Sequence, residues 1–217
     1  MTIPWEDKKL TIRQQEILIG ALLGDGRLEC RSLQGRARFR VHHADSQREL
    51  LFWKYLEFKE FVKREPWCTD WYDKRYNRLY RSWFFHTVTS EILAPLYRLF
   101  YKNNQKRVPD DIVNCLTPLV CAVWIADDGC RTDDSLILNT QSFSIEEQKV
   151  LLKALDKKYR VQGTINRDRR NFRLRFNKVN AQRLKLVVQK FTIPILHSKL
   201  VPVTTNPPAG GLVAVAR

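Results

Sequence analysis

Apolar residues recur with helical spacing between residues 12 and 24, so the sequence predicts a helix there. Thr11 and Gln14 form a capping-box pattern at its start. A glycine precedes Asp25 and another follows it, which predicts that the helix ends abruptly in a tight turn. The apolar positions assigned to this helix are Ile12, Ile17, Ile19, Leu22 and Leu23.

Strict alternation replaces helical spacing in residues 35–42, where the pattern predicts a strand with a basic face and an apolar face. The basic positions are Arg36, Arg38, Arg40 and His42, and the apolar positions between them are Ala37, Phe39 and Val41. Residues 45–64 return to helical spacing, and residues 67–85 predict a strand pair that turns near 76–77. A further helix is predicted over residues 91–101.

The second half of the chain repeats this order of elements. It predicts a helix over 116–127, strands around 130–141, a helix opened by the capping box of Ser144 and Glu147, strands around 160–177 and a helix over 178–190. The repeat predicts a fold of the α/β (α+β) class, built from two pseudo-symmetric αββαββα halves. The expected division is an N-terminal segment at 1–10, a first half at 11–110, a second half at 111–203 and a mobile C-terminal tail at 204–217.

The formal net charge of +15, with a sequence pI of about 9.8, indicates a polyanionic partner such as nucleic acid. An anionic membrane is the weaker alternative, because no apolar run approaches the roughly 20 residues that span a bilayer. The five cysteines include no C-x-x-C pair, so the sequence predicts neither a zinc site nor a disulfide framework. No secretion signal opens the sequence, and both an organelle and a prokaryotic cytoplasm fit this pattern.

Asp25 and Asp128 each end a predicted helix next to a glycine. The helix dipole disfavours a carboxylate at that end by about 0.3–1 kcal/mol, so placing one there in both halves indicates a compensating function. If the two helices pack side by side, the carboxylates meet and offer the hard oxygen ligands that suit Mg²⁺. Small residues that would permit this approach are Gly20, Gly24, Ala122 and Ala126.

A lysine in a Lys-x-Val-Pro setting occurs once in each half, at Lys106 and Lys199. A lysine beside carboxylate-bound Mg²⁺ and a phosphodiester can offset charge or help to activate the nucleophile. The two aspartates and two lysines together predict a hydrolytic nuclease site.

The basic strand faces suit the grooves of DNA, because an antiparallel ribbon can present arginines to phosphates and guanine edges. The first set of candidates is Arg36, Arg38, Arg40, His42, Arg173 and Arg175. A second basic ribbon carries Lys74, Arg75, Arg78 and Arg81, whose facings the sequence leaves open.

With these residues assembled, the chain resembles the LAGLIDADG homing endonucleases, in particular the monomeric branch with two motif copies, of the mitochondrial ribosomal RNA intron type. The copies are residues 18–26 (LIGALLGDG) and residues 121–129 (CAVWIADDG). Further likeness lies in residues 103–109 (NNQKRVP) and in residues 138–143 (LNTQSF), which contain Asn139 and Gln141.

The resemblance implies that the motif helices form the central interface and that two saddle-shaped antiparallel sheets bind a long, asymmetric DNA site. It implies Mg²⁺-dependent cleavage, with Mn²⁺ able to substitute, across the minor groove with 3′ overhangs, by a monomer that promotes intron mobility. Asp25 and Asp128 would be the catalytic metal ligands, joined by the backbone carbonyls of Gly24 and Asp127. Lys106 and Lys199 would lie near the scissile phosphates, and Asn139 and Gln141 would contact DNA.

Two alternatives stay open. The chain could be a maturase that binds its host intron RNA, because its charge suits RNA as well as DNA. It could also be a non-catalytic DNA-binding protein, which would bind tightly without yielding a metal-dependent product.

Overall fold

The computed structural model describes residues 9–30 and 36–200. The expected mobile tail at 204–217, almost all of the segment at 1–10 and the first position of the strand predicted at 35–42 lie outside the described residues.

The elements before residue 107 follow the predicted order. They are α1 (Ile12–Leu23), β1 (Arg27–Cys30), β2 (Ala37–Ala44), η1 (Asp45–Gln47), α2 (Arg48–Phe58), η2 (Lys59–Phe61), β3 (Trp67–Asp73), β4 (Arg78–His86), η3 (Glu91–Leu93), α3 (Ala94–Phe100), β5 (Tyr101–Lys102) and β6 (Gln105–Lys106). The predicted turn between β3 and β4 is confirmed, and Asn77 adopts a positive φ of 49° there. The short β5–β6 pair was not predicted.

The elements after residue 110 repeat this order. They are α4 (Ile112–Cys115), α5 (Pro118–Asp128), β7 (Gly129–Thr132), β8 (Ser135–Leu138), α6 (Ile145–Tyr159), β9 (Thr164–Asp168), β10 (Asn171–Phe176), α7 (Lys178–Val188) and α8 (Leu196–Lys199). The short helices α4 and α8 were not predicted. They are too short to show the apolar periodicity that identifies a helix.

Both predicted capping boxes are present. The hydroxyl of Thr11 accepts a hydrogen bond from the backbone N–H of Gln14, whose side chain accepts from the Thr11 N–H. Ser144 and Glu147 make the same reciprocal pair at the start of α6. These bonds satisfy backbone donors that a helix N-terminus leaves unpaired, which explains why sequence located both starts.

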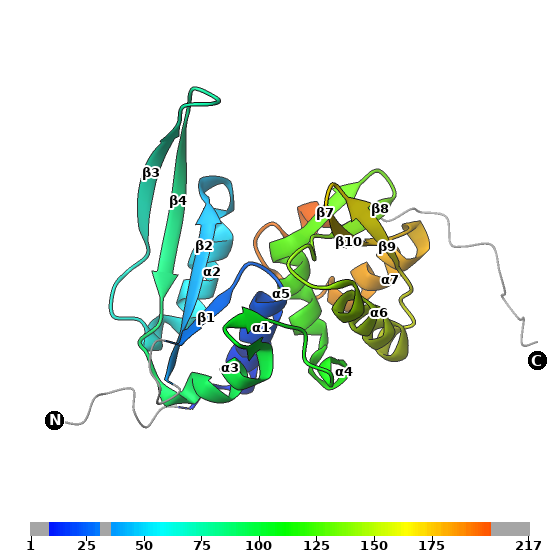
Figure 1. Cartoon of the computed structure of the whole chain (residues 1–217), viewed down its shortest axis with the longest axis horizontal. Helices are drawn as coiled ribbons and strands as arrows, with labels where there is room; N and C mark the ends of the chain where they lie inside the picture. The colour runs from blue at the N-terminus through cyan, green and yellow to red at the C-terminus, as the bar shows by residue number, and fades with distance from the viewer. Residues whose placement is uncertain (1–8, 31–35, 201–217) are drawn as a thin grey trace, which may run out of the picture.

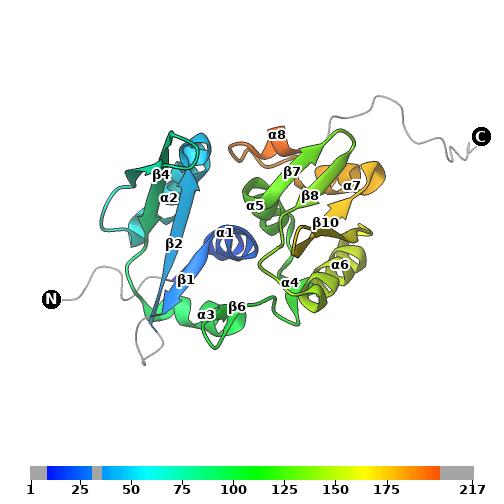
Figure 2. The same ribbon diagram turned by 45° about the horizontal axis from the view of Figure 1, so that its top comes forward.

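Each half holds one four-stranded antiparallel sheet, and the strands run in matching orders, β1-β2-β4-β3 and β7-β8-β10-β9. The two sheets lie on opposite sides of α1 and α5 (Figures 1 and 2). The alternation predicted for β2 is confirmed, because Ala37, Phe39 and Val41 are fully buried. The side chains between them lie on the other face of the sheet.

Helices α1 and α5 pack against each other at the centre of the molecule, as predicted. A Cβ atom on Gly20 would lie 2.7 Å from the Cβ of Val123, and one on Gly24 would lie 2.5 Å from the Cβ of Asp127. The α5 side chains nearest to these glycines, Val123 and Asp127, each come one position after the small residues Ala122 and Ala126 that were expected to permit the approach, and one residue turns a helix by about 100°. Both alanines are nevertheless buried.

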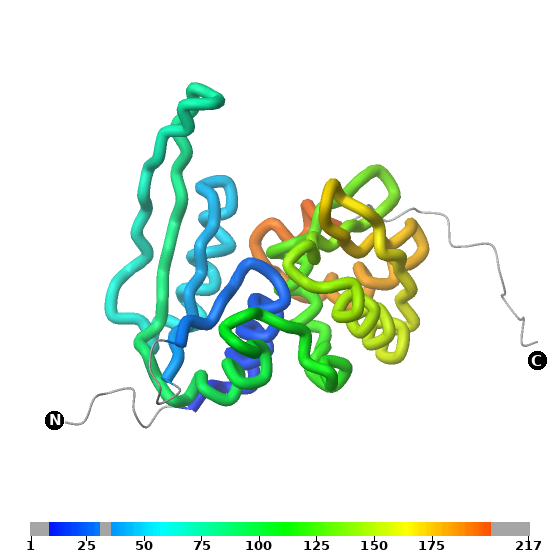
Figure 3. Tube along the Cα trace, viewed as in Figure 1, coloured from blue at the N-terminus to red at the C-terminus, as the bar shows by residue number. Residues whose placement is uncertain are grey.

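The β3–β4 hairpin reaches well beyond the rest of its sheet (Figure 3). Its strands contain 7 and 9 residues, whereas the equivalent β9 and β10 contain 5 and 6. The hairpin of the first half is therefore longer than that of the second half. Among the described residues, no helix has the length and apolar character needed to cross a membrane.

Candidate active site

The predicted aspartates of the two halves meet at one end of the central helix pair. Asp25 follows Gly24, the C-cap of α1, and Asp128 is the last residue of α5. Both line one hollow, whose walls are Gly24, Asp25, Lys106, Asp127, Asp128, Asn139, Gln141 and Ser142. The packing of α1 on α5 thus brings together carboxylates that are separated by a hundred residues of sequence.

Both carboxyl groups are held in surroundings that disfavour their charge. Burial, and then the neighbouring Asp127, raise the pKa of Asp25 to about 6. Burial, followed by Asp25 and Asp127, raises the pKa of Asp128 to about 8. Crowded carboxylates with raised pKa values are the arrangement that a divalent cation relieves, because its charge favours their ionised form.

The predicted lysines lie at the same helix ends. Lys106 donates hydrogen bonds to the carbonyl oxygens of Leu22 at 2.9 Å, Gly24 at 2.8 Å and Gly26 at 3.0 Å. Lys199 donates to the carbonyl oxygens of Ala126 at 2.5 Å and Asp127 at 2.7 Å. Each lysine therefore binds carbonyls that the end of its helix leaves without an intrahelical partner, and Lys106 also binds that of Gly26 in the following turn.

These contacts include both backbone carbonyls for which the family resemblance implies metal binding, those of Gly24 and Asp127. A carbonyl oxygen has two lone pairs, so it can accept from a lysine and still face a cation. Burial lowers the pKa of both Lys106 and Lys199, while the aspartates of the site act in the opposite direction. The ends of the two helices thus combine the carboxylates of Asp25 and Asp128, two carbonyls and two ammonium groups, of which that of Lys106 also lines the hollow.

A buried charged cluster beside the hollow was not predicted. Lys54 of α2 and Asp127 of α5 form an ion pair, and both side chains are 0% exposed. The Nε2 of His43, on β2, lies 3.2 Å from the Lys54 Nζ, and its Nδ1 lies 3.5 Å from the Asp25 Oδ2. Burial, and then the charge of Lys54, lower the pKa of His43 to about 3, so its ring is neutral.

Sequence contained only a weak signal for this cluster. His43 occupies an apolar-face position of β2, next to His42 on the basic face, and Lys54 falls on the apolar side of α2. A charged residue on a buried face usually has a partner. The partner, Asp127, comes from the other half, so only the tertiary structure identifies it.

The outward face of the first sheet carries several predicted DNA-binding residues. Cross-strand pairing places His86 opposite Arg40 and Phe84 opposite His42, on the face turned away from the core. His42 stacks on Phe84 with ring centroids 4.1 Å apart. This face is therefore part basic and part aromatic.

The hairpin residues divide between the two faces of the β3–β4 ribbon. Arg78 lies opposite Asp73, in line with the face of Arg40, whereas Arg81 lies opposite Asp70 on the other face and pairs with it at 2.7 Å. Lys74 and Arg75 lie in the exposed turn between the strands. Of the two arginines on β4, Arg78 therefore shares the face of Arg40 and Arg81 does not.

Glu29, on the edge strand β1, holds the arginines of β2 in place through ion pairs. Glu29 on β1 bonds Arg38 at 2.8 Å and Arg40 at 3.2 Å, and Arg27 at 2.6 Å. Burial alone would raise the pKa of Glu29, but hydrogen bonds from Arg38 and Arg40 outweigh it and lower the pKa to about 2. Arg36 precedes β2 and approaches the carbonyl oxygen of Thr89 at 3.5 Å.

In the second sheet, Arg173 and Arg175 alternate with the buried Leu174 and Phe176, as predicted. Arg173 lies 3.8 Å from Asp168, and Arg175 donates to the Ser135 hydroxyl at 3.2 Å. Gln141 also bonds Asp168, at 2.9 Å. Both arginines are thus held on the outward face of the sheet.

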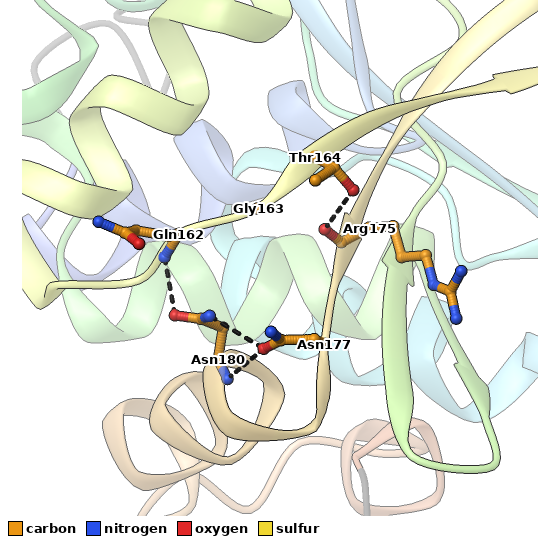
Figure 4. A pocket seen from close by; sticks show the side chains of 6 residues that line it. All are labelled: Gln162, Gly163, Thr164, Arg175, Asn177 and Asn180. Carbon is orange, nitrogen blue, oxygen red and sulfur yellow. Dashed lines mark hydrogen bonds between the residues drawn. The ribbon is translucent and has the colours of Figure 1, made fainter.

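A separate hollow lies where β9 and β10 meet α7 (Figure 4). It is lined by Gln162, Gly163, Thr164, Arg175, Asn177 and Asn180. The Asn180 side chain accepts from the Gln162 N–H at 2.8 Å, and Asn177 caps α7. These polar groups bond one another, and the lining has no carboxylate, so the hollow lacks the chemistry of the aspartate site.

Comparison with known proteins identifies relatives of this chain. The chain is 27% identical over 208 residues to the DNA endonuclease I-ChuI of Chlamydomonas applanata, which covers 88% of this chain and 95% of that protein. It is 29% identical over 167 residues to the cytochrome b mRNA maturase bI2 of Debaryomyces hansenii, covering 74% of this chain and 62% of that protein.

The fold matches that of the homing endonuclease I-WcaI, solved bound to its DNA recognition sequence, with a TM-score of 0.84. The match covers 92% of this chain and 91% of that one at 22% sequence identity, and it confirms the predicted α+β fold with antiparallel sheets. A model of the LAGLIDADG DNA endonuclease family matches residues 15–184. The chain therefore belongs to the LAGLIDADG DNA endonuclease family.

Proposed function

We propose that this chain is a site-specific endonuclease that hydrolyses both strands of a long, asymmetric DNA target with Mg²⁺ as its metal, and that it promotes intron mobility. The observation that carries the proposal is the meeting of Asp25 and Asp128 in one hollow, with Lys106 and Lys199 bound at the same helix ends. One chain supplies both halves of the site, so it acts as a monomer, divided near residues 110 and 111.

The donor set fits a hard divalent cation. Asp25, Asp128 and the carbonyls of Gly24 and Asp127 are all oxygen donors, which Mg²⁺ prefers and for which Mn²⁺ can substitute. The raised pKa values of both aspartates fit as well, because a cation removes their mutual repulsion. When bound there, the metal would activate water and stabilise charge on the scissile phosphate.

The residues around the hollow have distinct tasks in this proposal. Asp25 and Asp128 hold the charge that attracts the metal, and the ammonium groups of Lys106 and Lys199 stabilise negative charge on the phosphate oxygens. Asn139 and Gln141, which border the same hollow, contact the DNA beside the cleaved bonds.

The outward faces of the two sheets bind the duplex on either side of the hollow. Side chains on an antiparallel ribbon can reach base edges in the major groove, and the net charge of +15 favours the phosphate backbone. Glu29 and Asp168 hold arginines of the first and second sheets in place, which reduces the entropy lost on binding.

The test is cleavage of a duplex that joins the two exons flanking the insertion site of the gene, in the presence of Mg²⁺. The wild-type chain should cut it, and Asp25→Asn and Asp128→Asn should each lose at least about 100-fold in rate, the scale of losing a principal charge-stabilising group. Asp110→Asn, at an exposed aspartate, changes the same charge outside the hollow and should cut normally. Normal cutting by both site variants would overturn the proposed chemistry.

A second function, host-intron splicing, is favoured by the similarity to the bI2 maturase. Because splicing would not need the metal-binding carboxylates, Asp25→Asn should leave it intact while abolishing DNA cleavage. Splicing of the host intron RNA with and without the purified chain measures this directly, and equal splicing in both reactions would remove this second function.

A further inference from the structure

The buried cluster of His43, Lys54 and Asp127 lies directly behind the aspartate site and joins the two halves. Lys54 comes from α2 of the first half, and Asp127 from α5 of the second. All three side chains are 0% exposed, so water does not compensate their charges. Desolvating a lysine and an aspartate is costly, which indicates that the cluster serves a purpose beyond packing.

The ammonium of Lys54 determines how the ring of His43 carries its proton. A lysine ammonium has three donors and no acceptor, so the His43 Nε2 at 3.2 Å must accept from it. A neutral imidazole with an accepting Nε2 carries its hydrogen on Nδ1. The hydrogen-bond network thus selects one of the two tautomers.

The hydrogen on Nδ1 has one ready acceptor. The Nδ1 atom is buried and makes no hydrogen bond to the residues that the structure describes, and the Asp25 Oδ2 lies 3.5 Å from it. Closing that gap by roughly 0.5 Å would give an ordinary N–H···O bond. One oxygen of Asp25 would then be held by His43, while its other oxygen stays free toward the hollow.

We propose that Lys54 is a positioning residue: it fixes His43 in the Nδ1–H tautomer, and His43 in turn orients the carboxylate of Asp25 toward the metal. Asp127 balances the charge of Lys54 from the opposite half, so the orientation of Asp25 depends on correct docking of the two motif helices. The catalytic part of this inference rests on the proposed endonuclease function. The predicted tautomer of His43 does not depend on that function.

Among the described residues of the second half no histidine is buried, so this arrangement has no counterpart there. Helix α6 instead carries Gln148, a buried amide whose nitrogen lies within hydrogen-bonding distance of the carbonyls of Thr140, Phe143 and Phe172. Gln148 ties its own half together and approaches neither aspartate through these bonds. The proposal therefore predicts that the two metal-binding aspartates differ in how firmly they are held.

The first experiment is a ¹⁵N-histidine NMR spectrum of the full chain without DNA. The sequence has four histidines, His42, His43, His86 and His197, so single substitutions assign each signal. His43 should show a protonated Nδ1 and an unprotonated Nε2 near neutral pH. A wild-type His43 with its proton on Nε2 would overturn the proposal whether or not the chain cuts DNA.

The second experiment removes the lysine. Lys54→Met should let His43 populate the other tautomer and reduce kcat by about 10- to 100-fold, the range for groups that orient metal ligands. Because Lys54→Met leaves Asp127 buried without a partner, the double variant Lys54→Met/Asp127→Leu provides a folded test. In it Asp25 still faces Nδ1, so His43 should populate the Nδ1–H tautomer less fully than in the wild type. An unchanged tautomer in the double variant would contradict the role of Lys54.

Two controls separate positioning from stability. Leu50→Ala removes a fully buried apolar side chain from the same helix without touching a polar group, and it should lower stability while leaving the His43 signals unchanged. His43→Asn keeps an N–H donor near the position of Nδ1, so it should retain at least about 5-fold more kcat than His43→Leu, with KM for DNA alike in both. Equal kcat values would show that His43 only fills space.

Discussion

Gly24 and Asp127 meet where the motif helices cross, and they occupy the seventh position of their two motif copies. A Cβ on Gly24 would lie 2.5 Å from the Cβ of Asp127 and 2.9 Å from its Oδ2. The absence of a side chain on Gly24 therefore creates the space in which Asp127 turns toward Lys54. A glycine in the first half thus allows the second half to place the buried carboxylate of Asp127 at the helix crossing.

Gly24→Ala should destabilise the chain, because neither backbone nor the ion-paired Asp127 can move away cheaply. We expect a loss of about 1–3 kcal/mol in the free energy of unfolding, the scale of overpacking in a core. Urea denaturation followed by circular dichroism measures it. Ile12→Ala on the same helix, where the isoleucine is 77% exposed, should stay within about 0.5 kcal/mol of wild type. Equal stability of Gly24→Ala and wild type would mean that the helices cross differently.

The Lys54–Asp127 pair should show strong coupling in a double-mutant cycle. Lys54→Met alone leaves a buried carboxylate unpaired and should cost about 3–5 kcal/mol. Replacing both residues by apolar side chains should recover most of that loss, because a buried ion pair gains little over well-packed apolar groups. Denaturant titrations of wild type, the two single variants and Lys54→Met/Asp127→Leu give the coupling energy. Additive losses would show that the two side chains do not interact.

The metal-free chain should become less stable as the pH rises from about 5 to about 9. The folded-state pKa values of about 6 for Asp25 and about 8 for Asp128 lie above the ordinary value of 3.8, so folding favours the protonated forms. Their contribution is complete below about pH 4 and is lost as the pH rises through these values. Because cations bind the ionised carboxylates, Mg²⁺ should raise Tm more at about pH 9 than at about pH 5.

Thermal melts with and without Mg²⁺ across this pH range check the expectation. Asp128→Asn should flatten the metal-free profile and abolish most of the Mg²⁺ effect. A wild-type Tm that Mg²⁺ leaves unchanged at every pH would count against the metal site.

The long β3–β4 hairpin should make the DNA footprint lopsided. Its strands exceed β9 and β10 by two and three residues, which at about 3.3 Å per residue adds roughly 7–10 Å, or about 2–3 base pairs. Replacing residues 71–80 by an Asn-Gly turn should remove protection of those outer pairs on one side only. Hydroxyl-radical footprinting reports the length. As a control, the wild-type chain should bind a target shortened at that side with the same affinity as the shortened chain binds the full target. Loss of protection on both sides of the target would contradict the assignment of the hairpin to one side.

Much of the fold could be predicted because its signals are local. The capping box at Thr11, the glycine after Asp25 and the alternation in β2 each depend on neighbouring residues, so sequence located them correctly. The repeat then paired Asp25 with Asp128 and Lys106 with Lys199, since equivalent positions in duplicated halves share a setting. The basic faces followed from the period of a strand.

Sequence alone did not locate what depends on how the halves dock. Ala122 and Ala126 were expected at the helix crossing, yet Val120, Val123 and Asp127 are the residues nearest the glycines of α1. The sequence of an apolar helix does not show which of its sides contacts the partner helix, because only the packing of the two helices decides this. The same docking brings Asp127 to Lys54; the apolar side of α2 hints that Lys54 is buried, but no local pattern identifies its partner. The sequence by itself therefore determined the helices, the strands and the two aspartates, whereas the tertiary structure decided which charges are buried together behind them.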